Sequence, residues 1–186
     1  LMKNRYLITG GAGFIGSHLT DNLVGAGDDV IIIDDLSSGR LENFSKSEHV
    51  EIITKKVQDL HLHDVGQIDG IFHLAAQALV SISYSDPIET ITTNVIGTTN
   101  ILEALKQSNH HCVGIFITSD KCYDNVEWEW GYKETDALGG KDIYSGSKGA
   151  AEIIFKSYYQ SFFSSNDSKV KIATARAGNV IGGGDW

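Results

Sequence analysis

The sequence lacks a long apolar run. None of its hydrophobic stretches approaches the ~20 residues that a membrane-spanning helix requires, so no contact with a membrane is expected. The first residues, Leu1-Met2-Lys3, lack the apolar segment of a secretory signal peptide, and we therefore expect a cytoplasmic protein. With 41% hydrophobic and 21% charged residues, the composition is typical of a soluble globular protein.

Cysteine is also scarce. The only two, Cys112 and Cys122, fall at or beside an apolar, strand-like run, and their spacing is not that of metal ligands. Buried, unreactive thiols in a reducing compartment are expected in place of a disulfide. No metal site is predicted.

The sequence has fewer basic than acidic residues. The formal net charge is −9, and no cluster of Lys and Arg with interleaved aromatic residues offsets it. A surface of this sign repels nucleic acid, so no nucleic-acid partner is expected. A small phosphorylated ligand stays compatible with this charge, because helix N-termini and a few well-placed cations bind phosphate locally.

Strand-like and helix-like segments alternate along the 186 residues, which fit one domain. This alternation predicts an α/β fold, a doubly wound parallel (Rossmann) sheet that binds ligands outside the carboxyl ends of its strands. We see no internal repeat and no domain boundary. The predicted strands are 6–9, 30–34, 50–54, 70–74, 113–118 and 170–175, the predicted helices are 15–24, 89–105 and 144–163, and 35–49 and 123–142 are predicted loops.

A run of glycines follows the first predicted strand. In TGGAGFIGSH, Gly10, Gly13 and Gly16 lie between that strand and a helix expected to begin near Ala12. Such a turn lets the backbone approach a pyrophosphate, which the free amides and the positive end of the helix dipole then face. The stretch predicts a dinucleotide site, and an ordinary tight turn is the alternative.

The second predicted strand ends on an acid. Asp34 lies 24 residues after Gly10, where a carboxylate can accept hydrogen bonds from the ribose diol of an adenosine. The same carboxylate would repel a 2′-phosphate, so NAD is favoured over NADP. Arg40 is the nearby residue that could instead serve such a phosphate.

The spacing Gly-x-x-Gly-x-x-Gly resembles that of the extended short-chain dehydrogenase/reductase family, and HLAAQ at 73–77 is similar to the family's turn beside the nicotinamide. For Asp59 a solvated loop carboxylate is the alternative to a contact with adenine, and for Asn94 a plain polar helix face is the alternative to holding the active-site helix. The cofactor contacts that the resemblance implies are Gly10, Gly13, Phe14, Ile15, Gly16, Asp34, Asp59, Leu74, Ala75, Ala76, Asn94, Tyr144 and Lys148.

Tyr144 and Lys148 lie four residues apart at the start of a predicted helix, so both project from one face. A neighbouring ammonium favours the phenolate form of a tyrosine, which could then remove a hydroxyl proton. A surface tyrosine and lysine placed by chance are the alternative. The family resemblance adds Ser119, and the set Ser119, Tyr144 and Lys148 implies the oxidation of an alcohol.

Asp120 and Lys121 stand directly after Ser119 and could be a solvated loop. In its setting, TSDKCYD, the pair resembles nucleotide-sugar 4,6-dehydratases, which implies that Asp120 protonates the hydroxide leaving sugar carbon 6. An acid kept protonated by burial suits that role. Most dehydratases have Glu where this chain has Lys121, which would be a base only if desolvated and would otherwise stabilise enolate charge.

The segment 116–186, with EWEWGYKETDALGG and ARAGNVIGGGDW, is most similar to the CDP-glucose subgroup of these dehydratases. This resemblance implies a nucleoside-diphosphate hexose, CDP-glucose, as substrate, with contacts at Ser119, Asn179 and Arg176. Over 1–110 the sequence resembles nucleotide-sugar epimerases as much. Trp128, Trp130 and Trp186 are expected to pack against the protein.

Alternatives remain for the function. A nucleotide-sugar 4-epimerase or another sugar-nucleotide dehydratase is one, and an NAD-binding fragment or regulatory module without turnover is another. Because the family continues beyond the equivalent of Trp186 into a substrate lobe, we expect 1–186 to be the NAD-binding domain of a longer enzyme, without that lobe. The helices 88–106 and 144–163 are expected to form a homodimer interface, unless their apolar faces only cover the sheet.

Overall fold

The computed structural model describes residues 3–61, 63 and 65–184 and contains a six-stranded parallel sheet. Its strand order is β3-β2-β1-β4-β5-β6, so the direction of winding reverses between β1 and β4. This order confirms the predicted doubly wound sheet and locates the ligand crevice at that reversal. The strands are β1 (Arg5–Thr9), β2 (Asp29–Asp34), β3 (Val50–Thr54), β4 (Gly70–His73), β5 (Cys112–Ser119) and β6 (Val170–Ala177).

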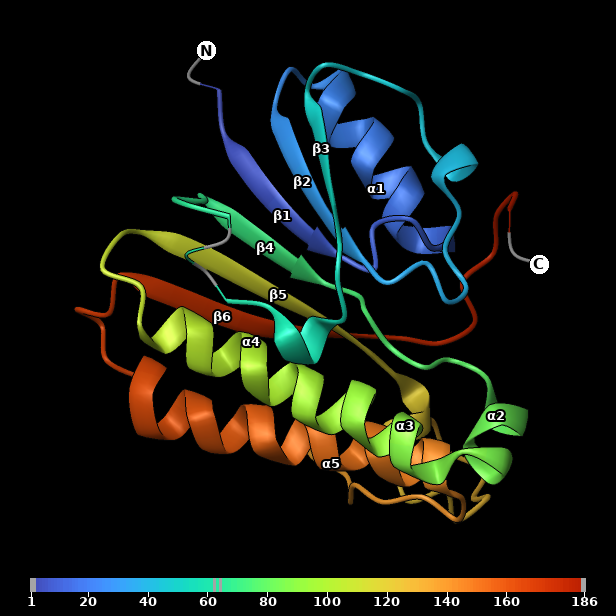
Figure 1. Ribbon diagram of the computed structural model, residues 1–186. Coiled ribbons are helices and arrows are strands. Elements are labelled where there is room, and N and C mark those ends of the chain that lie inside the picture. Colours follow the sequence, from blue (N-terminus) through green and yellow to red (C-terminus); the bar gives the residue numbers. More distant parts are fainter. Residues whose placement is uncertain (1–2, 62, 64, 185–186) are drawn as a thin grey trace.

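Helices cover both faces of the sheet (Figure 1). Helix α1 lies on one face, and α4 and α5 lie side by side on the other. Short 3₁₀ turns interrupt the connections at Leu41–Asn43, Val57–Asp59 and Asp120–Cys122. The helices are α1 (Phe14–Gly25), α2 (Val80–Ser85), α3 (Pro87–Ile91), α4 (Gly97–Lys106) and α5 (Ile143–Tyr158), with π-helical turns at Thr92–Ile96 and Tyr159–Phe163.

The core has two layers because successive strand residues point to opposite faces of the sheet. On one face Leu7 and Ile31 pack with Leu102 of α4 and Phe155 of α5. On the other face the buried strand residues pack against α1 and the turn before it, as Ile8, Val30 and Ile32 do with Ala12, Leu19 and Leu23. Nearly continuous apolar strands are what a sheet covered on both faces requires.

The single helix predicted over 89–105 is three consecutive elements, α3, the π turn and α4, and α2 was not predicted at all. Helix α3 starts where Asp86 accepts a hydrogen bond from the backbone amide of Glu89, with Pro87 in the first turn. These two signals separate α3 from α2. The helix predicted over 144–163 is α5 followed by the π turn Tyr159–Phe163, and the helix predicted over 15–24 and all six predicted strands are confirmed to within three residues.

Apolar side chains also lie on the outside of the helical layer. Ile88, Ile96 and Ile153 are 72%, 51% and 51% exposed, whereas Ile101 and Leu102 are buried against the sheet. The helices therefore cover the sheet and still present apolar surface, and pairing with a second copy stays a prediction.

No helix in the described part of the chain is both long enough and apolar enough to cross a bilayer.

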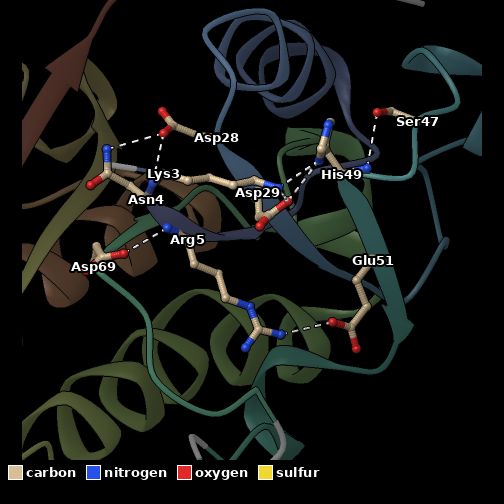
Figure 2. Close-up of polar contacts among 9 residues, drawn as sticks. All are labelled: Lys3, Asn4, Arg5, Asp28, Asp29, Ser47, His49, Glu51 and Asp69. Atoms are coloured by element: carbon tan, nitrogen blue, oxygen red, sulfur yellow. Dashed lines mark hydrogen bonds and ion pairs between the residues drawn. The ribbon is translucent and has the colours of Figure 1, made fainter. Parts of the chain in front are cut away.

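Charged side chains are paired across strands at the amino ends of β1, β2 and β3 (Figure 2). The Lys3 ammonium lies 2.6 Å from the Asp29 carboxylate, which also contacts His49 at 3.1 Å. Arg5 reaches Glu51 at 3.1 Å. The hydrogen bond from Lys3 lowers the pKa of Asp29 below its ordinary value. At this end of the sheet the charged side chains are thus paired with partners of opposite sign.

The segment after β6 returns to α1 across the carboxyl ends of the strands (Figure 1). The His18 ring nitrogen Nε2 lies 2.9 Å from the carbonyl oxygen of Gly183. Gly182 lies so close to Phe14 that a Cβ atom there would stand 2.9 Å from the ring. The last described residues therefore pack against the first turns of α1.

Candidate functional site

The glycine turn is close-packed against the strand end of β4. Gly10 has a φ of +72°, and a Cβ atom there would lie 2.8 Å from the backbone nitrogen of Ala75. A Cβ on Gly16 would lie 2.2 Å from the carbonyl oxygen of Gly10. Helix α1 begins at Phe14, two residues later than expected, and no side chain caps its amino end. Its first amides therefore remain available to an anion.

Asp34 is buried at the end of β2 and accepts two backbone hydrogen bonds. One carboxylate oxygen accepts from the amide of Ala12 at 3.0 Å and the other from Leu36 at 2.9 Å. Burial raises the pKa of Asp34, and the two hydrogen bonds oppose that shift. The carboxylate thus fixes the glycine turn, and its remaining lone pairs are free for a ribose diol. Asp59 lies at the same edge, in the turn after β3.

Leu74, Ala75 and Ala76 follow β4 directly. The backbone of Leu74 and Ala75 lies against Gly10, and Ala75 and Ala76 line a small cavity with Asn94 and Lys148. The amide of Ala75 donates to the Thr9 hydroxyl at 3.2 Å. His73, beneath them, is held between Thr9 and Thr98 at 2.7 and 3.1 Å. Burial lowers the pKa of His73 to about 3, so this imidazole is neutral.

Tyr144 and Lys148 project from the start of α5, where Asp142 caps the helix by accepting from the amide of Ser145. Both side chains are buried, so the alternative of a surface pair is wrong. The Lys148 ammonium lies 5.7 Å from the centre of the Tyr144 ring. Burial lowers the pKa of Lys148 to about 8.

The expected lowering of the Tyr144 pKa by Lys148 is not found. Burial raises the pKa of Tyr144, the charges of Asp120 and Asp142 raise it further, and only a hydrogen bond with Ser119 lowers it. The physical reason is desolvation, which disfavours a phenolate more than a lysine over the ring face favours it. The protein groups alone therefore favour the phenol form of Tyr144, and the cationic nicotinamide is the remaining group expected to favour the phenolate.

Asn94 is buried in the π turn and connects α5 to the loop after β4. Its amide nitrogen donates to the Ser147 hydroxyl at 2.9 Å and to the Gln77 carbonyl at 3.1 Å, and its oxygen accepts from the Gln77 amide at 2.8 Å. The alternative of a plain polar helix face is therefore wrong. Asn94 sets the distance between the helix that carries Tyr144 and the loop that carries Ala76.

Asp120 and Lys121 lie in the turn after β5 and are exposed. Ser119 donates to the Asp120 carboxylate at 3.2 Å, and the Lys121 ammonium lies 3.8 Å from the same carboxylate. The side chains are 48% and 54% exposed, so the burial expected to keep Asp120 protonated is absent from this turn, and Lys121 is not desolvated there. The expected burial of Asp120 was wrong because the turn after β5 is exposed, and of the two roles left open for Lys121 this exposure favours the stabilisation of negative charge.

Arg176 and Asn179 have different surroundings. Arg176 forms a bidentate ion pair with Glu152, at 2.9 and 3.1 Å, and also donates to the Tyr123 hydroxyl and to the Glu134 carbonyl oxygen. Four of its five N–H groups are thus used within the protein. Asn179 is exposed beyond β6. Substrate contacts by these two residues stay predictions.

The structure adds residues that were not predicted. His73, Ser147 and Glu152 are all buried beside the predicted set. Ser147 lies inside the Tyr-x-x-x-Lys motif, and Glu152 lies four residues after Lys148, so helical spacing could have identified both. The two thiols are buried as expected, and burial raises the pKa of Cys112 and Cys122 to about 11. No metal-binding cluster occurs among the described residues.

The family model described as GDP-mannose 4,6 dehydratase matches residues 7–166. The chain belongs to this family. The predicted membership of the extended short-chain dehydrogenase/reductase family is thereby confirmed, and the strand order is that of a Rossmann fold.

Particular relatives carry different activities. The CDP-glucose 4,6-dehydratase of Salmonella typhimurium strain LT2 is 53% identical over 119 residues, 62% of this chain and 33% of that protein. UDP-glucuronic acid decarboxylase 1 of Arabidopsis thaliana is 34% identical over 188 residues, 96% of this chain and 40% of that protein. The UDP-glucose 4-epimerase of Thermus thermophilus in complex with NAD is 30% identical, with a TM-score of 0.78 over 92% of this chain and 54% of that chain.

Proposed function

We propose that this chain provides the NAD-binding and catalytic residues for dehydration of a nucleoside-diphosphate hexose, CDP-glucose, to the 4-keto-6-deoxy sugar nucleotide. The observation that carries the proposal is that Ser119 donates to the Asp120 carboxylate at 3.2 Å at the end of β5, and that Ser119 and Asp120 both act on the pKa of the buried Tyr144. An acid and a phenol would thus act on the same bound hexose. The relatives at 53% and 34% identity act on sugar nucleotides by their names, which supports the substrate class.

The residues around the crevice fit NAD. The uncapped amino end of α1 suits a pyrophosphate, and the glycines leave no side chain between it and the loop after β4. Asp34 suits a ribose diol and opposes a 2′-phosphate. Gly13, Phe14, Ile15, Ala75 and Ala76 would line this site, with Lys148 near the nicotinamide ribose. Bound NAD would supply a reversible hydride acceptor for sugar carbon 4.

Ser119, Tyr144, Lys148 and Asp120 would each have a separate role in the proton transfers of the reaction. Tyr144 would take the proton of the carbon 4 hydroxyl, which Ser119 orients by a hydrogen bond. The Lys148 ammonium, 5.7 Å from the ring, would stabilise the Tyr144 phenolate that takes this proton, while the hydride of carbon 4 would pass to NAD. Asp120 would then protonate the hydroxide that leaves carbon 6. Because Asp120 is exposed in this chain, the bound hexose would have to cover it.

Lys121 would act on carbon 5. Its side chain is 54% exposed and lies 3.8 Å from Asp120. In this setting the ammonium would stabilise the enolate that forms when the carbon 5 proton is lost, and the covering substrate would decide whether it could also serve as the base.

A 4-epimerase is the second candidate, because the chain superposes on a UDP-glucose 4-epimerase with a TM-score of 0.78. The position of Asp120 favours the dehydratase, since epimerisation needs no acid at carbon 6. A regulatory NAD-binding module would share the crevice and lack turnover. The chain spans 33% and 40% of the two curated relatives, so we also propose that 1–186 is an NAD-binding domain acting with further chain, as a homodimer.

The proposal is tested by replacing Asp120 with Asn in the intact protein. CDP-, dTDP-, GDP- and UDP-hexoses would be supplied with NAD and the products identified by mass and NMR. We expect a 4-keto-6-deoxy product from CDP-glucose, lost by about 10²- to 10⁴-fold in Asp120→Asn, with NAD affinity unchanged. Asp167→Asn, an exposed acid remote from the crevice, is the matched control.

Three results would contradict the proposal in different ways. A ring epimer as the product would identify the epimerase. Dehydration that survives Asp120→Asn would remove Asp120 as the acid. NAD binding without turnover of any of the four sugar nucleotides would leave the regulatory module.

A further inference from the structure

The ion pair between Glu152 and Arg176 lies beneath the site and joins three of its parts. Glu152 is 4% exposed and lies on α5, two turns after Tyr144 and one turn after Lys148. It accepts from Arg176 on β6 and from the Thr118 hydroxyl on β5. Thr118 directly precedes Ser119, so the carboxylate ties the helix of the tyrosine to the strand end of the serine.

Arg176 also reaches into the loop 123–138, which we call the aromatic loop. Its guanidinium donates to the Tyr123 hydroxyl at 2.9 Å and to the Glu134 carbonyl oxygen at 3.1 Å, and it stacks on the Tyr123 ring at 4.9 Å. The Tyr123 ring also stacks on Tyr132, whose ring contacts Trp128. Arg176 is thus the inner end of a column of rings that runs outward through the loop.

The stem of the aromatic loop is fixed at the site. Tyr123 and Leu138 form an antiparallel bridge, and the amide of Gly139 donates to the Cys122 carbonyl oxygen at 2.9 Å. A Cβ atom on Gly149 of α5 would lie 2.9 Å from the Gly139 oxygen. The aromatic loop begins two residues after Lys121 and ends shortly before α5 begins. Its stem is therefore in contact with the helix that carries Tyr144 and Lys148.

Beyond the stem, no described apolar core supports the loop. Trp128 and Trp130 are 49% and 76% exposed, and the buried clusters of the sheet contain no residue of 123–138. The loop is held by the Tyr123 stacking and the hydrogen bonds of Tyr132 with Asn125 and Val126, by backbone and side-chain hydrogen bonds within its own turns, and by an exposed pair of Glu127 with Lys141 at 3.9 Å. Arg176 adds two hydrogen bonds from β6. Of these, only the Arg176 contacts connect the loop to the sheet.

We propose that Arg176 is a positioning residue, which uses its ion pair with Glu152 to hold the aromatic loop as one wall of the sugar-nucleotide site. The proposal rests on the function proposed above and changes the expected role of Arg176 from a substrate contact to a support. Trp128 and Tyr132, at the outer end of the column, would then contact the sugar nucleotide and contribute to its selection.

Two variants separate the contacts. Arg176→Lys keeps the charge and removes the planar fork that serves Glu152, Tyr123 and Glu134 together. Tyr123→Phe removes one hydroxyl and keeps the stacked ring. The matched controls are Arg5→Lys, whose guanidinium pairs with Glu51 at the opposite edge of the sheet, and Tyr84→Phe, which is 72% exposed.

Trypsin cleavage after Lys133, in the aromatic loop, reports the loop without requiring turnover. We expect about tenfold faster cleavage in Arg176→Lys and a smaller increase in Tyr123→Phe, because Arg176→Lys disturbs several contacts of the loop and Tyr123→Phe removes a single hydrogen bond. The KM for the sugar nucleotide should rise about tenfold in Arg176→Lys, with kcat and NAD affinity within about twofold of the parent. General damage to the fold would instead lower the active fraction and hence kcat.

Unchanged cleavage after Lys133 in both variants would overturn the proposal, and so would a kcat that falls while KM is kept. If the parent protein turns over no sugar nucleotide, the proposed function fails, and the cleavage rates alone still decide whether Arg176 holds the loop. Faster cleavage in the control variants as well would show a global effect and would also overturn it.

Discussion

The two ends of the parallel sheet have opposite electrostatic designs. At the amino ends of the strands, exposed charges meet partners of opposite sign, as Lys3 meets Asp29 and Arg5 meets Glu51 (Figure 2). At the carboxyl ends, a lysine is buried over a tyrosine ring without a carboxylate partner among the described residues. One end has its charges paired in water, and the other keeps a charge where water is excluded.

This difference indicates that the carboxyl ends of the strands lower the stability of the fold and the amino ends do not. An exposed ion pair contributes little to folding but causes no strain. A buried ammonium is destabilising unless it loses its proton, which is why burial lowers the pKa of Lys148. In a sheet that is otherwise well packed, a loss of stability confined to one end of the strands is typical of a functional site.

Replacing Tyr144 with Phe tests the carboxyl end most strongly. The change removes the one hydroxyl that we expect to exchange a proton with the sugar, so turnover should fall by about 10²- to 10⁴-fold. NAD affinity and the melting temperature should stay close to those of the parent, because the ring still packs. Tyr84→Phe is the control. Turnover within about twofold of the parent would show that the proton leaves by another group.

Replacing Lys148 with Met should abolish turnover and stabilise the fold. The unfolded lysine titrates near 10.5 and the folded one near 8, so below pH 8 the folded state holds a proton at a cost of about 3 kcal/mol. The gain in unfolding free energy should be full below pH 8, shrink as the pH rises to 10.5 and vanish above it. Denaturant unfolding of both proteins at several pH values measures it.

A constant gain at all pH values would mean that Met improves packing and that the charge of Lys148 is not the cause. A loss of stability at pH 7 would mean that the ammonium has a stabilising partner. Either result would remove the contrast between the two ends.

Replacing Asp29 with Asn tests the amino end, where the smallest effect is expected. Because Lys3 and His49 lower the pKa of Asp29, its contribution is present above about pH 4 and is lost as the solution becomes more acidic. The melting temperature at pH 7 should fall slightly in low salt and hardly at all in about 1 M salt, since screening weakens an exposed pair. A shift larger than that of Lys148→Met would reverse the comparison.

The fold was predictable because its signals are local and repeated. Six apolar strands and the glycine turn required only the alternation of β-branched runs with helical stretches. Asp34 followed from the rule that parallel sheets bind ligands at the carboxyl ends of their strands, whereas Ser119 was implied by the family resemblance. Tyr144 and Lys148 needed only helical spacing.

What could not be predicted depends on contacts between distant segments. Glu152 meets Arg176 across 24 residues of sequence, and Thr9 meets His73 across 64. The exposure of Asp120 and the raised pKa of Tyr144 are also set by the shape of the finished edge and by no local pattern. Sequence spacing shows which helix or strand carries a side chain. Only the packing of the folded chain decides how far that side chain is exposed to solvent.

The π turn at Thr92–Ile96 has a consequence for how such a site could be lost. A π turn is an α-helix with one extra residue, and here the widened turn contains the buried Asn94. Deleting a single codon from this stretch would restore the ordinary pitch and rotate the amide away from Ser147, with every named site residue still encoded. A homologue that folds normally but has lost its activity would need no other change. A one-residue gap in this helix, seen when its sequence is aligned with this one, would identify it.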